Sequence, residues 1–299
     1  MVDLFSRIEA DAKGCAAERD FSFAAHTTIG IGGKAPLCLH PEGAAAAVHA
    51  LRLCRRFGVP HLVLGMGANV LAADGGFDGV VLCTDRMRAL SLQGRCAAAE
   101  SGVCMPRLLR CLAENGLGGF AFMAGIPASV GGAVYMNAGT ARGHFGDRVL
   151  SVTAVDADGE IVELSGKECA FAYKNTAFTG KNMLILSARL QADYCCYARA
   201  NDEIGEVLRE RARLPKGKSM GCVFKNPEGM SAGEIIDRAG LKGAAEGDAF
   251  VSAEHANFII NGGHATAKDV RALIGRVKGT VLERTGIALT EEIEYIGDD

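Results

Sequence analysis

The sequence predicts an α+β fold in which helices and strands alternate without the regular repeat of a βαβ array. Runs with apolar residues at helical spacing alternate with short apolar runs that are typical of strands. A hairpin signal, Asp156-Ala157-Asp158-Gly159, lies between two β-rich runs within residues 150 to 164. Glycine occupies 39 of the 299 positions, about twice its usual share of ~7%. This content indicates many tight turns or close approaches of the backbone to a ligand.

The first 200 residues contain most of the predicted strands. The Ala-rich segment 43–57 carries apolar residues at helical spacing and ends at Gly58-Val59-Pro60, as a helix would. A strand over 61–64 then runs into the turn-forming segment Gly65-Met66-Gly67-Ala68-Asn69. The remaining elements expected here are an extended segment at 70–71, a strand at 79–84, a helix at 105–115, the hairpin within 150–164 and a strand at 183–190.

The domain boundary is expected near residue 200, where polar residues cluster from Tyr197 to Glu203. A helix over 204–213 follows, and Ser231 with Glu234 forms a capping box that begins a helix over 233–239. A longer helix begins at Thr266 and ends at Gly286, and the chain closes on an extended segment at 288–296. Residues 201–299 are therefore predicted to form a small α/β domain.

Composition excludes several classes of protein. A net charge of -3 disfavours a nucleic-acid partner, since binding to the phosphate backbone usually leaves a basic excess. No apolar run reaches the ~20 residues that a membrane span needs, and the N-terminal segment lacks the apolar core of a signal peptide. The eleven cysteines are odd in number and contain no Cys-x-x-Cys pair, which predicts a reducing, cytoplasmic setting and no metal site. Most of them are expected to be small buried hydrophobes.

Three glycine-rich segments are the candidates for ligand binding: 29–33, 64–69 and 125–139. None matches the Gly-x-Gly-x-x-Gly fingerprint or a P-loop. Glycine-rich turns expose backbone N–H groups and remove Cβ atoms, so that a pyrophosphate can approach without a cation. The alternative for any single segment is an ordinary hairpin turn. Three such segments, one of them directly after a strand, favour a ligand site.

These segments resemble those of the UDP-N-acetylenolpyruvoylglucosamine reductase family in their order along the chain and in their amino-acid residues, over nearly the whole chain. The most specific is Gly125-Ile126-Pro127-Ala128-Ser129-Val130-Gly131-Gly132-Ala133-Val134-Tyr135-Met136-Asn137-Ala138-Gly139. Five further segments carry the resemblance: 26–33 (HTTIGIGG), 64–71 (LGMGANVL), 221–227 (GCVFKNP), 239–243 (AGLKG) and 251–258 (VSAEHANF). The compact link at 190–220 resembles the shorter subtype, which lacks an inserted tyrosine loop.

The resemblance implies a two-part FAD-binding domain of the PCMH/vanillyl-alcohol-oxidase-like type over residues 1–200, with subdomains at about 20–73 and 74–195. It also implies a substrate-binding domain over 201–299. FAD would be bound non-covalently, and NADPH would be the reductant. The cofactor-binding residues implied are Gly32, Gly33, Gly65, Met66, Gly67, Ala68, Asn69, Val70, Gly125, Ile126, Pro127, Ser129, Gly131, Gly132 and Asn137. Ala68 and Ala128 stand where the family commonly has Ser and Gly.

The activity implied is NADPH-dependent reduction of UDP-N-acetylglucosamine enolpyruvate to UDP-N-acetylmuramate in peptidoglycan precursor synthesis. Such an enzyme would be a cytoplasmic flavoprotein with small-molecule partners only, and would serve cell-wall biogenesis, cell shape, the cell cycle and cell division. Two rival functions remain open. One is a different FAD oxidoreductase on the same fold, and the other is a catalytically silent flavin- or nucleotide-sugar-binding protein.

Three residues are implied to be catalytic, and two of them depart from the family pattern. Lys174 stands where the family has an arginine that binds the substrate carboxylate, and Cys222 stands where it has a proton-donating serine. Glu292 aligns with the family's catalytic glutamate, although the neighbouring Glu291 leaves the register to be tested. The substrate-binding residues implied are Tyr173, Lys225 and Asn226.

These residue types suit the chemistry. Hydride delivery to the enolpyruvyl methylene builds negative charge at the α-carbon and carboxylate, which a cation such as Lys174 stabilises. A thiol, with a reference pKa near ~8.5, is more acidic than a serine hydroxyl and can supply the proton. The alternatives are a buried core cysteine at 222, a solvated lysine at 174 and an edge-strand charge at 292. The basic stretch from Arg209 to Lys218 either clasps a diphosphate or is a solvated helix face and loop.

Overall fold

The computed structural model describes residues 4–181 and 183–298. Its described residues divide into two compact units, and the predicted α+β class is confirmed. The first unit contains residues up to 19, 37–66 and 79–212, and the second contains 20–36, 67–78 and the chain from 213 onward. The chain therefore passes between the units several times. The domain boundary near residue 200 stays a prediction. The assignment of one domain to FAD and one to substrate stays a prediction.

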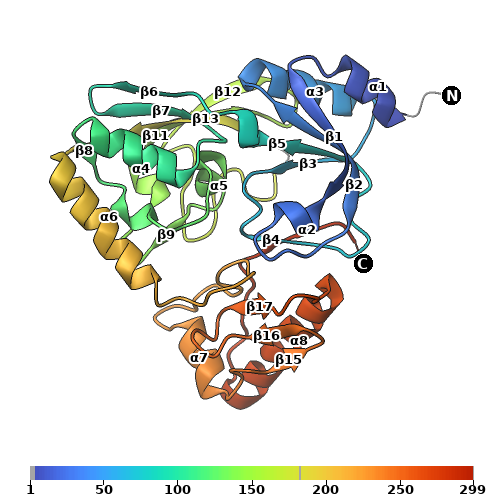
Figure 1. Ribbon diagram of the computed structural model, residues 1–299, viewed down its shortest axis with the longest axis vertical. Coiled ribbons are helices and arrows are strands. Elements are labelled where there is room, and N and C mark those ends of the chain that lie inside the picture. The colour runs from blue at the N-terminus through green and yellow to red at the C-terminus, as the bar shows by residue number, and fades with distance from the viewer. Residues whose placement is uncertain (1–3, 182, 299) are drawn as a thin grey trace. The chain divides into compact units, whose positions relative to one another are not determined.

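A five-stranded antiparallel sheet forms the largest layer of the first unit (Figure 1). Its strands, in spatial order, are β12 (Ile161–Ser165), β11 (Val149–Val155), β13 (Leu184–Gln191), β7 (Cys96–Glu100) and β6 (Leu90–Gln93). Val155 pairs with Ile161, which confirms the predicted hairpin. Helices α4 (Met105–Glu114), α5 (Val130–Tyr135) and α6 (Tyr197–Arg211) belong to the same unit.

A second sheet has four strands and includes the predicted strand at 61–64. In spatial order these are β1 (Cys15–Ser22), β2 (Lys34–Pro41), β5 (Val80–Cys83) and β3 (His61–Leu64). Helix α3 (Ala44–Arg56) confirms the helix predicted over 43–57, and it shares one core with α1 (Leu4–Asp11) and with the inward side chains of β2 and β5. Short elements complete the first unit: β8 (Leu117–Gly118), β14 (Asp193–Tyr194), β9 (Gly139–Thr140), β10 (Gly143–His144), η1 (Thr84–Arg86), η2 (Ala121–Met123) and η3 (Phe145–Arg148).

The second unit is built around α8 (Ala267–Thr285), which begins at the capping box of Thr266 and ends at Gly286, as predicted. It packs with α7 (Ala232–Arg238) and a three-stranded antiparallel sheet of β15 (Ala245–Glu246), β16 (Ala249–Val251) and β17 (Ile259–Asn261). Of the extended segment predicted at 288–296, only β18 (Glu294–Ile296) is a strand, and it pairs in parallel with β4 (Val70–Ala72). The short helix α2 (Phe23–His26) also lies in this unit.

Two expectations from the sequence differ from the structure. The helix predicted over 204–213 begins earlier, at Tyr197, so the polar segment 197–203 forms the first half of α6. Arg199 and Glu203 form an i,i+4 ion pair at 3.0 Å and Ala200 is buried, so local pairing and packing extend the helix. Most cysteines are also not fully buried: four are buried, six are half-buried and one, Cys196, is exposed, and all eleven are free thiols.

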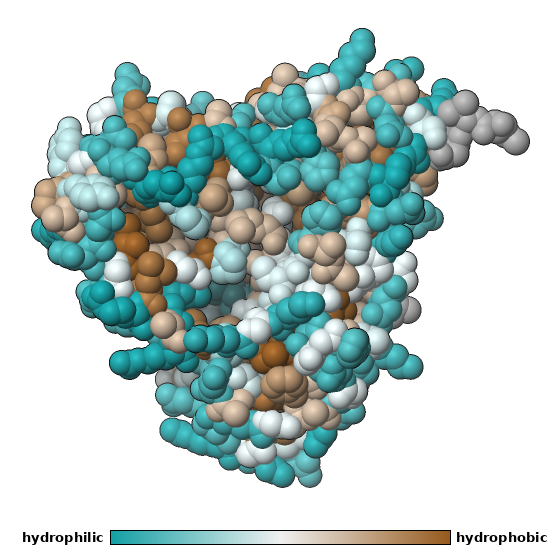
Figure 2. All heavy atoms as spheres, in the orientation of Figure 1, coloured by the Kyte–Doolittle hydropathy of each residue, from teal (hydrophilic) through white to brown (hydrophobic). Residues whose placement is uncertain are grey.

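Hydrophilic residues cover much of the face drawn in Figure 2, and smaller groups of hydrophobic residues lie between them. Among the described residues, no helix is both long enough and apolar enough to cross a membrane.

Candidate active site

Gly32 and Gly33 allow their segment to pack closely against another segment of the protein's own backbone. A Cβ on Gly32, whose φ is +119°, would lie 2.6 Å from Cβ of Ala72, and one on Gly33 would lie 2.4 Å from the carbonyl oxygen of Asp74. The N–H of Gly33 donates to the carbonyl of Ala73 at 2.9 Å. This segment therefore requires glycine to lie against residues 72–76, immediately after the second glycine-rich segment.

The turn at 65–69 follows β3 directly, as predicted. Gly67 has φ of +62°, and a Cβ there would lie 2.3 Å from the carbonyl oxygen of His26. Within the described chain, no hydrogen bond has the N–H of Met66, Gly67 or Ala68 as its donor. Consecutive free N–H groups in a glycine turn are the donor set that a pyrophosphate requires. These residues fit the diphosphate of a dinucleotide such as FAD.

The segment 125–139 contains the short helix α5. Ser129 caps it: the Ser129 hydroxyl accepts from the N–H of Gly132 at 3.3 Å. A Cβ added to Gly65 would lie 2.9 Å from the Oγ of Ser129. The second and third glycine-rich segments therefore meet at Gly65 and Ser129. Arg211 of the basic stretch lies against Gly125, 3.2 Å from the position of a Cβ there.

Asn137 ties this segment to the turn that carries Lys174. Its side-chain amide donates to the carbonyl of Ala172 at 2.9 Å and accepts from the N–H of Gly146 at 2.9 Å. Ala172 and Asn175 pair across a tight turn, which places Tyr173 and Lys174 at its tip. Lys174 has φ of +52°, an uncommon left-handed conformation for a residue with a side chain. Its half-buried side chain and the 47%-exposed Tyr173 lie at the end of this turn.

Cys222 and Glu292 belong to two segments that the second unit brings side by side. The N–H of Glu292 donates to the carbonyl of Val223 at 2.7 Å, and the N–H of Lys225 donates to the carbonyl of Thr290 at 2.8 Å. Both Cys222 and Glu292 are half-buried. The oxygen of the Asn226 side chain accepts from the N–H of Ala232 at 2.9 Å, which fixes this predicted substrate residue at the start of α7.

Asn69 joins the end of the glycine turn to the segment that carries Glu292. Its side-chain amide donates to the carbonyl of Glu292 at 3.0 Å, and its own carbonyl accepts from the N–H of Glu294 at 2.9 Å. The parallel pairing of β4 with β18 continues this contact. A predicted cofactor residue and a predicted catalytic residue are therefore neighbours, although 223 positions separate them.

Glu291, the alternative to Glu292, is occupied by other partners. Its carboxylate accepts from Lys278 Nζ at 2.6 Å and from the Tyr295 hydroxyl at 2.5 Å. Burial raises the pKa of Glu291, but the hydrogen bonds from Lys278 and Tyr295 together lower it below the ordinary value. This carboxylate is held ionised in a structural pair, which leaves Glu292 as the better catalytic candidate.

Of the predicted site residues, the first unit contains Tyr173 and Lys174, while the second contains Cys222, Lys225, Asn226 and Glu292. Asn69, Ser129 and Asn137 each have a structural contact in addition to their expected roles. Ser101 packs against Gly131 and so leaves no room for a side chain there. No sequence pattern indicates this role, because it arises only from the close approach of α5 to Ser101.

The fold and these segments place the chain among FAD-binding proteins: residues 35–165 match the family model "FAD binding domain". Residues 213–296 match the family model "UDP-N-acetylenolpyruvoylglucosamine reductase, C-terminal domain". The chain belongs to the UDP-N-acetylenolpyruvoylglucosamine reductase family.

Its relatives support this membership over nearly the whole length. The UDP-N-acetylenolpyruvoylglucosamine reductase of Clostridium perfringens (strain SM101 / Type A) is 36% identical over 282 residues, which cover 94% of this chain and 93% of that one. That of Moorella thermoacetica is 41% identical over 275 residues, covering 91% of each.

Two solved structures are also similar. The crystal structure of UDP-N-acetylenolpyruvylglucosamine reductase from Thermus caldophilus matches with a TM-score of 0.82 at 35% identity, covering 95% of this chain and 100% of that one. A Physcomitrella patens BBE-like 1 variant matches with a TM-score of 0.51 at 17% identity, covering 63% of this chain and 44% of that one, and shares the fold alone.

Proposed function

We propose that this protein reduces UDP-N-acetylglucosamine enolpyruvate to UDP-N-acetylmuramate, with NADPH as the reductant and non-covalent FAD as the carrier, in peptidoglycan precursor synthesis. The observation that carries the proposal is the hydrogen bond from Asn69 to the carbonyl of Glu292. It sets a candidate catalytic carboxylate beside a turn whose free N–H groups suit a pyrophosphate. Membership of the reductase family supports the same reaction.

Bound FAD would supply the hydride, taken from NADPH, that is added to the methylene carbon of the enolpyruvyl group. In this proposal the Lys174 ammonium binds the substrate carboxylate and stabilises the negative charge that grows there. Tyr173, next to it at the tip of the turn, contacts the sugar nucleotide. A lysine offers a point charge in place of the planar fork of an arginine, so the carboxylate is held with less directional control.

The proton that completes the reduction comes from Cys222 in this proposal. Its Sγ–H is transferred to the α-carbon, and the resulting thiolate regains a proton from solvent before the next turnover. Glu292, in the segment hydrogen-bonded to Val223, orients the substrate or shares this proton. Lys225 and Asn226 follow Cys222 in sequence and bind the substrate from the same segment. The location in the cytoplasm and the roles in cell shape, the cell cycle and cell division follow from this pathway position.

Anaerobic stopped-flow spectroscopy separates this function from its rivals. The purified yellow protein should lose its visible flavin absorbance on mixing with NADPH and regain it on mixing with UDP-N-acetylglucosamine enolpyruvate. Acid precipitation should release the flavin into the supernatant. A reduced flavin that this substrate does not re-oxidise would indicate another oxidoreductase. A protein whose flavin NADPH does not reduce would support the catalytically silent alternative.

A further inference from the structure

Outside the candidate active site, two neighbouring strands gather a histidine and two thiols on one face of a sheet. Strands β2 and β5 pair in parallel with Leu39 opposite Leu82, so the register places His40 beside Cys83. Because side chains alternate along a strand, Cys38 lies on the same face as both. Cys38, His40 and Cys83 are 0%, 8% and 5% exposed, so the face is nearly closed to solvent.

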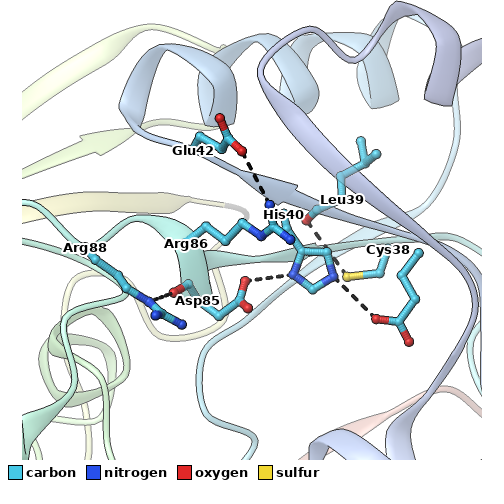
Figure 3. Close-up of polar contacts among 8 residues, drawn as sticks. Cys38, Leu39, His40, Glu42, Asp85, Arg86 and Arg88 are labelled. Atoms are coloured by element: carbon cyan, nitrogen blue, oxygen red, sulfur yellow. Dashed lines mark hydrogen bonds and ion pairs between the residues drawn. The ribbon is translucent and has the colours of Figure 1, made fainter.

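Asp85, two residues beyond Cys83, completes the cluster. Its Oδ1 lies 2.7 Å from Nδ1 of His40 (Figure 3). The ligand atoms of His40, Cys83 and Asp85 lie within 4.8 Å of one another. The Cys38 and Cys83 side chains are within hydrogen-bonding reach of each other. Three potential metal ligands therefore converge from β2, β5 and η1, and the Cys38 thiol, which donates to the carbonyl of Leu39 at 3.9 Å, lies next to Cys83 as a fourth.

A disulfide does not explain this pair of thiols. Cys38 is opposite Val81, two positions before Cys83. With strands ~4.8 Å apart and a rise of ~3.3 Å per residue, the two Cα atoms are separated by roughly 8 Å. This exceeds the ~7 Å limit for bridging without movement of the backbone. The thiols therefore stay available as ligands.

We propose that Cys38, His40, Cys83 and Asp85 form a binding site for a zinc ion. Two sulfurs, an imidazole nitrogen and a carboxylate oxygen make a four-coordinate set of the kind that structural zinc prefers. Around an ion with bonds of ~2.0–2.3 Å, neighbouring ligand atoms lie roughly 3.3–3.8 Å apart. The ligand atoms of His40, Cys83 and Asp85 already lie within 4.8 Å of one another, and binding of the ion would draw the four side chains together.

The surroundings of His40 favour binding through Nδ1. The other ring nitrogen, Nε2, faces a Glu18 carboxylate oxygen at 3.5 Å. A carboxylate behind a ligating histidine fixes the ring tautomer and orientation. Arg88, whose guanidinium donates to the main-chain oxygen of Asp85, offsets part of the negative charge of the ligands. The Asp85 side chain is 41% exposed and gives the ion a path from solvent.

An ion bound here would stabilise the sheet next to the glycine turn that begins at Gly65. Cys83 pairs with Leu64 of β3, and Leu64 directly precedes the glycine turn that begins at Gly65. An ion that joins β2 to β5 would therefore fix the sheet edge from which this turn departs. No substrate atom needs to contact it, so the role is one of stabilisation.

The test is metal binding by the FAD-loaded protein. Metal-free protein should bind one Co²⁺ per chain and develop a thiolate-to-cobalt charge-transfer band, which one equivalent of Zn²⁺ then abolishes. Cys83→Ala, which leaves Cys38 as the one thiolate ligand, should weaken the band, while the matched variant Cys54→Ala, at a buried thiol in the same unit, should retain it in full. Asp85→Asn, at a partly exposed position, should weaken Zn²⁺ binding at least ~10-fold.

A thermal measurement covers the case in which a core variant folds poorly. Zn²⁺ should raise the midpoint of unfolding of the wild type and of Cys54→Ala, and raise that of Asp85→Asn less. Absence of the charge-transfer band in the wild type would overturn the proposal. So would a band, or a Zn²⁺-dependent thermal shift, that persists undiminished in both Cys83→Ala and Asp85→Asn.

Discussion

The side-chain amide of Asn137 donates a hydrogen bond of 2.9 Å to the main-chain oxygen of Ala172 and so connects the longest glycine-rich segment to the turn of Lys174. The same amide accepts from the N–H of Gly146, so both of its ends are used. Asn137 is 5% exposed and has φ of +42°. Asn137 is expected to bind the cofactor, and these hydrogen bonds indicate that it also positions Lys174, a catalytic candidate.

Replacing Asn137 by Ala should slow re-oxidation of the flavin by substrate more than its reduction by NADPH, because the Lys174 turn loses its anchor. The two lost hydrogen bonds should also lower the free energy of unfolding by about 1–3 kcal/mol. Stopped-flow kinetics and urea titration measure the two effects. Asn115→Ala is the matched control, since its amide donates to the carbonyl of Cys111 on an exposed helix end. Equal slowing of both half-reactions would argue against the positioning role.

Gly131→Ala should destabilise the protein and weaken FAD retention, although alanine is ordinarily better than glycine in a helix by roughly 0.5–1 kcal/mol. The new Cβ would lie 2.8 Å from Cβ of Ser101. Ser101 is unable to retreat easily, because it is 1% exposed and its carbonyl accepts from the N–H of Gly131 at 2.8 Å. Overpacking of this kind typically costs ~1–3 kcal/mol. Thermal unfolding and the flavin released on gel filtration report both effects.

The control for this variant is Gly275→Ala in α8, where a Cβ meets no atom within 4 Å. That change should raise stability slightly and leave flavin content unchanged. If Gly131→Ala behaves in the same way, the close approach of α5 to Ser101 is not limiting.

The local elements could be predicted because their signals are local. The helix at α3 has its apolar spacing and its Gly-Val-Pro stop within one segment, and the hairpin of β11 and β12 has its turn residues between two β-rich runs. The glycine-rich segments could also be identified from the sequence, because the residues of each segment are consecutive.

Pairings between distant segments could not be predicted in this way. Nothing near Glu294 indicates that β18 pairs with β4, and the C-terminal segment was expected to be extended throughout. The cluster of His40, Cys83 and Asp85 has no motif, because it exists only through the parallel pairing of β2 with β5. The same applies to Asn69 and Glu292, whose contact depends on that distant pairing.

Lys174→Ala should slow the substrate half-reaction by roughly 10²- to 10³-fold, the typical loss when one group that stabilises a developing oxyanion is removed. Flavin reduction by NADPH should change much less. Lys174→Arg should retain or improve turnover, since it keeps the charge and restores the bidentate fork. Lys167→Ala, at an exposed lysine of the same unit, serves as the control. Normal turnover by Lys174→Ala would remove this residue from the site.

Glu291→Gln should lower the stability of the protein, whereas Glu292→Gln should slow its turnover. The folded-state pKa of Glu291 is lowered, so its contribution to stability is present above the unfolded value of ~4.3 and is lost as pH falls through the lower folded value. Glu291→Gln should therefore cost about 1 kcal/mol at neutral pH, reduced from the full charged pair because Lys278 is 43% exposed. The difference from wild type should shrink in acid.

Glu292→Gln, in contrast, should slow turnover, because the substrate loses an orienting or proton-sharing acid. Urea unfolding at several pH values and steady-state kinetics measure the pair. If Glu291→Gln is the variant that loses turnover without loss of stability, the alignment of the catalytic glutamate must shift by one residue.

Cys222→Ala should leave reduction of the flavin by NADPH near normal and slow its re-oxidation by substrate, because the α-carbon loses its positioned acid. Loss of a general acid typically costs roughly 10²- to 10⁴-fold. Cys222→Ser should recover most of this loss, since serine presents a donor in nearly the same position. A thiol also gives a pH signature, because it loses its proton in alkali whereas a serine hydroxyl keeps its own. The substrate half-reaction should therefore decline at high pH in the wild type but not in Cys222→Ser. Stopped-flow re-oxidation measured across this pH range provides the test, and an unimpaired Cys222→Ala enzyme would mean that water or another residue supplies the proton.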